Sequence, residues 1–213
     1  MKFIKDPEFE IFDYEKQVIQ VISLVAKCKT QLTFNTLETI PYFNEIMNRE
    51  LDAIIDTLTK INHFHASARC ARAALELTLI NLYGHFHSQG SLLSASFKEK
   101  YGVKKLTHKT ESPILELVEN GVLDQLEFDL LRESYSNLSN YVHSRETYHL
   151  FHTLPHMIKS EQYYADVLKL AGERGNTARI VKATLINYSL KPGLETLLMF
   201  LKIYERVKSP KKV

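Results

Sequence analysis

The stretch that decides the fold is LLRESYSNLSNYVHSR, residues 130–145. Wound as an α-helix at about 100° per residue, it separates polar from apolar side chains with little overlap. The side chains within roughly 60° of His143 form a polar stripe: Arg132, Ser136, Ser139 and Asn140. The apolar ones gather about 80° to 140° away: Leu131, Tyr135, Leu138 and Val142. The pattern predicts an amphipathic helix over about 123–143 whose polar stripe is either a binding surface or a solvent-facing side.

Helical periodicity continues through most of the chain. Apolar side chains recur at three- and four-residue steps in several segments: 14–32, 40–61, 64–86, 158–170, 178–188 and 194–204. Pro113 is placed to begin a short helix that ends at Asn120-Gly121. Pro192-Gly193 predicts a turn before the last helix. The sequence therefore predicts an all-α fold, an antiparallel bundle over residues 1–154 with additional C-terminal helices, 155–213, packed on the same domain.

The composition is that of an ordinary globular protein of 213 residues, with 45% hydrophobic and 24% charged residues. The charge is uneven. From Lys169 onward ten Lys and Arg stand against three Glu, a charge of +7, which leaves −5 on the first 168 residues. A basic C-terminal third suits nucleic acid or another acidic surface, and it equally suits plain solubility.

Two features predict a cytoplasmic protein that does not enter a membrane. Cys28 and Cys70 are the only cysteines, and both fall on apolar helical faces, which predicts reduced and buried thiols. The start of the sequence, MKFIKDP, has no apolar signal-peptide core, and the apolar run Val18–Ala26 is too short to span a bilayer.

Most motifs that bind cofactors or carry catalysis are absent. The sequence has no GxxxxGK(S/T), GxGxxG, HExxH or GxSxG, so we expect no cofactor. His149, His152 and His156 lie close together in the sequence and could offer imidazoles to zinc, but no acidic or Cys ligand stands beside them. We therefore assign no metal site.

Two groups of residues remain as candidates for chemistry. Arg72 and Glu76 are four residues apart on one helical face, and they form either an exposed ion pair or a half-buried one that orients a base or holds phosphate. His143 can exchange a proton at neutral pH, and the arginine and hydroxyls of its stripe can bind phosphate. These are the components of a metal-independent ribonuclease, and they are also common at polar helix ends.

Together these residues resemble the HEPN superfamily, small all-α domains of prokaryotic toxins, defence systems and CRISPR effectors. The resemblance covers residues 64–145 and has two parts: Arg-x-x-x-Glu at Arg72 and Glu76, and a later helix that ends in Tyr-x-x-Leu-Ser-x-x-Val-His at His143. It implies a homodimer in which the two helix ends face one another and form a composite RNA-cleaving cleft.

The chain departs from that family at one point. Active members place an Arg before the His with four to six residues between them, and these slots here hold Leu138, Asn137 and Ser136. Arg132 shares the face of His143 but lies about 16 Å up the helix axis, too far to act beside it. The cation for catalysis would then be Arg145 or an Arg of the partner subunit.

Two functions follow as hypotheses. One is a dimeric protein that binds RNA or nucleotide, with His143 and Arg145 catalytic and the polar stripe, Arg72 and Glu76 binding. The other is a non-catalytic helical interaction module, such as a subunit or neutralising partner in a toxin or defence system, in which His143 and Ser139 only satisfy hydrogen bonds at a helix end.

Overall fold

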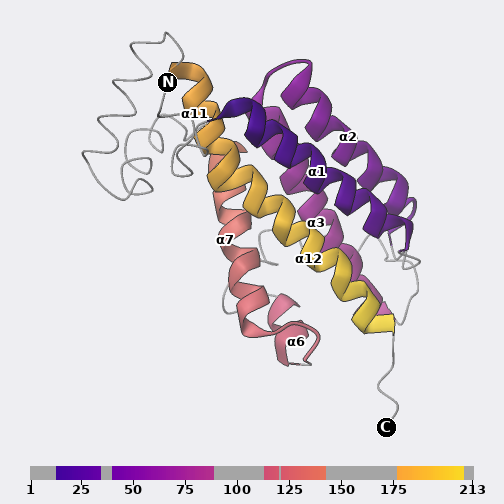
Figure 1. The fold of residues 1–213 in the computed structure, drawn as a ribbon. Helices are drawn as coiled ribbons and strands as arrows, with labels where there is room; N and C mark the ends of the chain where they lie inside the picture. Colours follow the sequence, from indigo (N-terminus) through magenta and orange to yellow (C-terminus); the bar gives the residue numbers. More distant parts are fainter. Residues whose placement is uncertain (1–12, 35–39, 89–112, 120, 143–176, 209–213) are drawn as a thin grey trace.

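A computed structural model describes residues 13–34, 40–88, 113–119, 121–142 and 177–208 (Figure 1). Their regular elements are α1 (Tyr14–Thr33), α2 (Phe43–Thr59), α3 (Phe64–Ser88), α6 (Pro113–Glu119), α7 (Gln125–Val142), α11 (Thr177–Leu185), a π-helical segment η3 (Ile186–Leu190) and α12 (Lys191–Lys208). No strand occurs in this part of the chain, so the all-α prediction is confirmed.

The helices begin and bury the faces that the periodicity predicts. The carboxylate of Asp13 accepts a hydrogen bond from the Lys16 backbone N–H at 3.0 Å, which caps the start of α1. Asp124 caps α7 in the same way, since its carboxylate accepts from the Glu127 N–H at 2.8 Å while Glu127 bonds back to the Asp124 N–H at 3.0 Å. Four residues of the predicted seam are buried in α1, together with the polar Gln17: Val21, Val25, Cys28 and Leu32.

α12 occupies the middle of the bundle. It contacts α1, α3 and α7, and α2 packs against α1 and α3 on the far side (Figure 1). Leu138 lies against Gly193, and Ser134 against Thr196, so α7 and α12 run antiparallel. The last helix therefore shares one core with the N-terminal helices. The predicted division at residue 154 lies outside the described residues.

The predicted turn at Pro192-Gly193 is wrong, because both residues lie inside α12. A proline within an α-helix lacks the N–H for a ladder bond, and its ring meets the carbonyl four residues earlier. Here η3 ends at Leu190, two residues before the proline, and the Lys191 N–H reaches back five residues to the Ile186 carbonyl. The wider π turn makes room for the Pro192 ring, so the helix continues.

Gly193 serves close packing and not a turn. A Cβ at this position would lie 2.8 Å from Leu138 Cδ1 and 3.3 Å from its Cγ. The Leu138 side chain is fully buried, so it has little room to move aside.

We predict that Gly193→Ala lowers the free energy of unfolding by about 1 kcal/mol, because overpacking outweighs the gain in helix propensity. Chemical denaturation measures the change. In a Leu138→Ala background the added methyl has space, and there Gly193→Ala should stabilise. An equal effect in both backgrounds would contradict the close approach.

The prediction of two buried thiols is half correct. Cys28 is buried and free, and its thiol lies 3.8 Å from the Leu194 carbonyl oxygen. Burial raises the pKa of Cys28 to about 12. Cys70 is also free but only partly buried, on the edge of the apolar face of α3. Among the described helices none is both long and apolar enough to cross a membrane.

Candidate functional site

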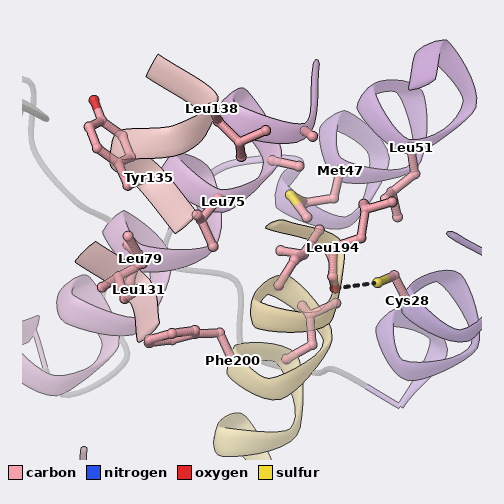
Figure 2. Packing of buried hydrophobic residues seen from close by; sticks show 14 of the residues in the cluster. Cys28, Met47, Leu51, Leu75, Leu79, Leu131, Tyr135, Leu138, Leu194 and Phe200 are labelled. Carbon is pink, nitrogen blue, oxygen red and sulfur yellow. Dashed lines mark hydrogen bonds between the residues drawn. The ribbon is translucent and has the colours of Figure 1, made fainter. Parts of the chain in front are cut away.

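The apolar face predicted for α7 is buried where its side chains are described, and two residues of the predicted polar stripe are exposed. Leu131, Tyr135 and Leu138 are buried, and Leu131 and Leu138 belong to the common core. Arg132 and Ser136 are exposed on another side of the helix. Figure 2 shows the Tyr135 hydroxyl pointing away from the leucines that surround it. The apolar face thus anchors α7 and leaves one polar group, this hydroxyl, at the edge of the core.

The Tyr135 hydroxyl meets the ion pair predicted on α3. Arg72 Nε donates to Glu76 Oε1 at 2.8 Å, and Arg72 Nη2 donates to the Tyr135 hydroxyl at 2.6 Å. That hydroxyl donates in turn to Glu76 Oε1 at 2.8 Å. The guanidinium also lies 4.8 Å from the centre of the Tyr135 ring. These three residues form a closed arrangement that we call the α3–α7 cluster.

Burial decides between the two interpretations of the Arg72–Glu76 pair. The side chains of Arg72 and Glu76 are 18% and 21% exposed, so the pair is half-buried and not on the open surface. The residue of α7 that bonds to this pair is Tyr135. Arg132 is exposed elsewhere on the same helix. Within the described residues two of the five N–H groups of the guanidinium serve these bonds, and its side chain is only 18% exposed, so an incoming anion would reach it along one edge.

The environment of Tyr135 keeps its hydroxyl protonated. Burial raises the pKa of Tyr135 to about 12, and the hydrogen bond to the Glu76 carboxylate acts in the same direction. The positive charge of Arg72 opposes this rise in the pKa only in part. The hydroxyl therefore remains a hydrogen-bond donor to Glu76 at neutral pH.

We predict that Tyr135→Phe lowers the free energy of unfolding by about 1–2 kcal/mol at pH 7, because Arg72 and Glu76 each lose a half-buried partner. The tyrosine pKa is higher in the folded chain than its usual value of 10. The stabilisation by the hydroxyl is therefore complete below pH 10 and declines as the pH rises through about 12. Unfolding titrations of both proteins at several pH values measure it, and a difference that grows with pH would contradict the cluster.

The remaining stripe residues differ in their surroundings. Arg132 and Ser136 line a shallow hollow of about 320 Å³ together with Asp129, Glu133 and Asn137. The Oγ atom of Ser139 is buried and has no hydrogen-bond partner within the described ranges. Ser139 lies one turn after Tyr135, on the side of α7 that leads toward position 143.

Several predicted site residues fall beyond the described part of the chain. His143 and Arg145 follow the last residue of α7, and the side chain of Asn140 is also outside the description. The same holds for His149, His152 and His156. Within the described ranges no three His, Cys, Asp or Glu side chains lie close enough together to hold a metal ion.

Tyr135 is the member of the site that the sequence reasoning missed. The apolar pattern placed it correctly on the buried face, but only as an anchor. Its hydroxyl bonds to Glu76 and Arg72, 59 and 63 residues away in the sequence, and no local pattern indicates contacts of that range. The available signal was chemical: a buried tyrosine hydroxyl needs a polar partner, and an Arg-x-x-x-Glu pair provides one.

The arrangement can hold a guanidinium in a fixed orientation and present part of it to an anion. The carboxylate of Glu76 offsets the positive charge of the Arg72 guanidinium. The cluster is therefore better suited to orienting an anion than to attracting it strongly. Comparison with known proteins adds nothing to this description: no protein-family model matches the chain, and no match is found among curated proteins or among solved structures.

Proposed function

We propose that this chain is an HEPN-like helical protein that binds RNA or nucleotide as a cytoplasmic homodimer. In its finer form the proposal is a metal-independent ribonuclease of a prokaryotic defence or toxin system, with His143 as the proton-transfer group. The observation that carries it is the α3–α7 cluster. Arg72 and Glu76 of the motif that resembles this superfamily are half-buried and bonded to Tyr135 of the second motif.

The helical spacing supports a link between the cluster and the end of α7. Tyr135 and Ser139 precede His143 by eight and four residues, so on a regular helix they stand about 80° and 40° around the axis from position 143. The cluster fixes this part of α7 against α3. A rigid support of this kind is what a catalytic side chain at a helix end needs.

The proposed chemistry is transfer within the RNA strand. His143 takes the proton of a ribose 2′-hydroxyl, whose oxygen then forms a bond to the adjacent phosphorus. The bond from phosphorus to the 5′-oxygen breaks, and that oxygen receives a proton from His143 of the partner subunit. Arg145, or an arginine of the second copy, stabilises the charge on the phosphorane. The products are a 2′,3′-cyclic phosphate and a 5′-hydroxyl.

The test is incubation of the full chain with labelled single-stranded RNA in EDTA. The proposal predicts cleavage without added metal and products that end in 2′,3′-cyclic phosphate. Cleavage that appears only with Mg²⁺, or products with 3′-hydroxyl ends, would contradict this mechanism.

One observation favours a non-catalytic interaction module as the second candidate. Glu76 and Tyr135 already use the Arg72 guanidinium, and no arginine occupies the slots at Ser136, Asn137 and Leu138. In this case the chain binds a protein partner, as a subunit or neutralising partner does, and cleaves no RNA. Neither binding nor cleavage of RNA in the test above, under any metal condition, would favour this role.

A further inference from the structure

A pocket of about 460 Å³ lies between α7 and α12, away from the α3–α7 cluster. The two helices pack side by side here, as Figure 1 shows. The residues that line the pocket come from α7, η3 and α12: Leu130, Glu133, Ser134, Asn137, Tyr188, Pro192, Glu195, Thr196 and Met199. Its volume lies in the range of pockets that bind small molecules.

The inside of the pocket is mainly apolar. Leu130 and Met199 lie on facing helices, and Tyr188 and Pro192 complete the wall. The polar groups at its base are already satisfied, because the hydroxyls of Ser134 and Thr196 are buried and bond to each other at 2.7 Å. An occupant of this space would therefore gain most from apolar contact.

The entrance carries negative charge from both sides. Glu133 on α7 and Glu195 on α12 are exposed, and within the described ranges neither carboxylate forms an ion pair or a hydrogen bond. Lys191 lies one turn before Glu195 and interacts with it electrostatically, although its ammonium donates hydrogen bonds to the amide oxygens of Gln17, Gln20 and Asn187. The pocket thus combines apolar walls with two carboxylates that have no hydrogen-bonded cation within the described ranges.

The π-helical segment contributes to this site. η3 ends at Leu190, two residues before Pro192, and places Tyr188 in the pocket wall. A π segment breaks the regular helix hydrogen bonding at some cost, and such segments are frequent beside functional sites. The π-helical segment is therefore a second observation that points to this pocket, separate from the two carboxylates at its entrance.

We propose that this pocket binds a small organic cation, an amine with an aromatic or aliphatic body. The body lies between Leu130 and Met199, and the ammonium lies at the entrance between Glu133 and Glu195. This site goes beyond the proposed RNA function and shares no residue with the α3–α7 cluster.

Dansylcadaverine is a suitable probe, because it joins an apolar fluorophore to a primary ammonium. We expect saturable binding to the full chain, with a fluorescence increase, at concentrations below about 1 mM. The double variant Glu133→Gln/Glu195→Gln should weaken binding by about tenfold, since each exposed charge pair contributes modestly. The matched control, Glu45→Gln/Asp129→Asn, removes the same charge outside the pocket and should bind as the unchanged protein does.

Two further measurements locate the site. Neutral dansylamide, which lacks the ammonium, should bind at least about fivefold more weakly than dansylcadaverine. Met199→Arg fills the apolar wall with a long cationic side chain and should abolish binding, with circular dichroism as the check on folding. Three results would overturn the proposal: no saturable binding, equal weakening in the control variant, or equal binding of dansylamide. If Met199→Arg does not fold, the double variant Glu133→Gln/Glu195→Gln still tests the site, because both side chains are exposed and their substitution leaves the core intact.

Discussion

His143→Ala is expected to lower metal-free RNA cleavage by about 10²- to 10⁴-fold, the usual contribution of a general acid or base. Initial rates on labelled single-stranded RNA in EDTA measure the loss. The reason is that the described members of the α3–α7 cluster offer no substitute: Glu76 and Tyr135 are bonded to each other, and the Tyr135 pKa of about 12 excludes it as a base.

The control for this prediction is Arg49→Ala. Arg49 is exposed on α2, where it pairs with Glu45, so its loss should leave the rate unchanged. Equal cleavage by the His143→Ala protein would show that the activity belongs to another residue or to a contaminant, and the ribonuclease proposal would be withdrawn. Neither result bears on the proposal that the pocket between α7 and α12 binds an organic cation.

Phe200→Ala should produce the largest loss of stability, about 3–5 kcal/mol in the free energy of unfolding. Phe200 is fully buried, and it projects from α12 toward Leu131 of α7 and Leu79 of α3 (Figure 2). Its removal therefore leaves a cavity where three helices meet. Because α12 sits inside the bundle, the loss should appear in one cooperative unfolding transition.

Lys202→Ala is the matched variant on the same helix. Lys202 is exposed, so its substitution should change the unfolding free energy by no more than about 0.5 kcal/mol. Two separate transitions for the Phe200→Ala protein, or a loss below about 1 kcal/mol, would contradict a core shared between α12 and the N-terminal helices.

The helices could be predicted because burial repeats with the helical period. The predicted segment 123–143 corresponds to α7 at Gln125–Val142, and the short helix predicted at Pro113 is α6. Cap residues such as Asp13 fix the ends, and they too can be recognised locally. Elements held by such short-range rules are the ones the sequence specifies most directly.

Features that depend on long-range packing were not predictable. Pro192-Gly193 has the composition of a turn, yet the helix continues through it because η3 accommodates the proline and Leu138 packs against the glycine. Tyr135 looks like a core residue until Arg72 and Glu76 are seen across from it. In each case the deciding partner lies on another helix or in a rare turn type, and neither leaves a periodic signal.

The most direct test of the central proposal is to measure RNA binding by fluorescence anisotropy at several salt concentrations. The protein used is His143→Ala, which is expected not to cleave the RNA. Binding to single-stranded RNA should weaken as salt rises, and Arg132→Ala should reduce the slope of log K against log salt by about 0.7, the value for one lost phosphate contact. The exposed Arg49→Ala on α2 serves as the control and should leave the slope unchanged. Absence of binding at low salt, or an identical slope for Arg132→Ala, would contradict an RNA-binding stripe on α7.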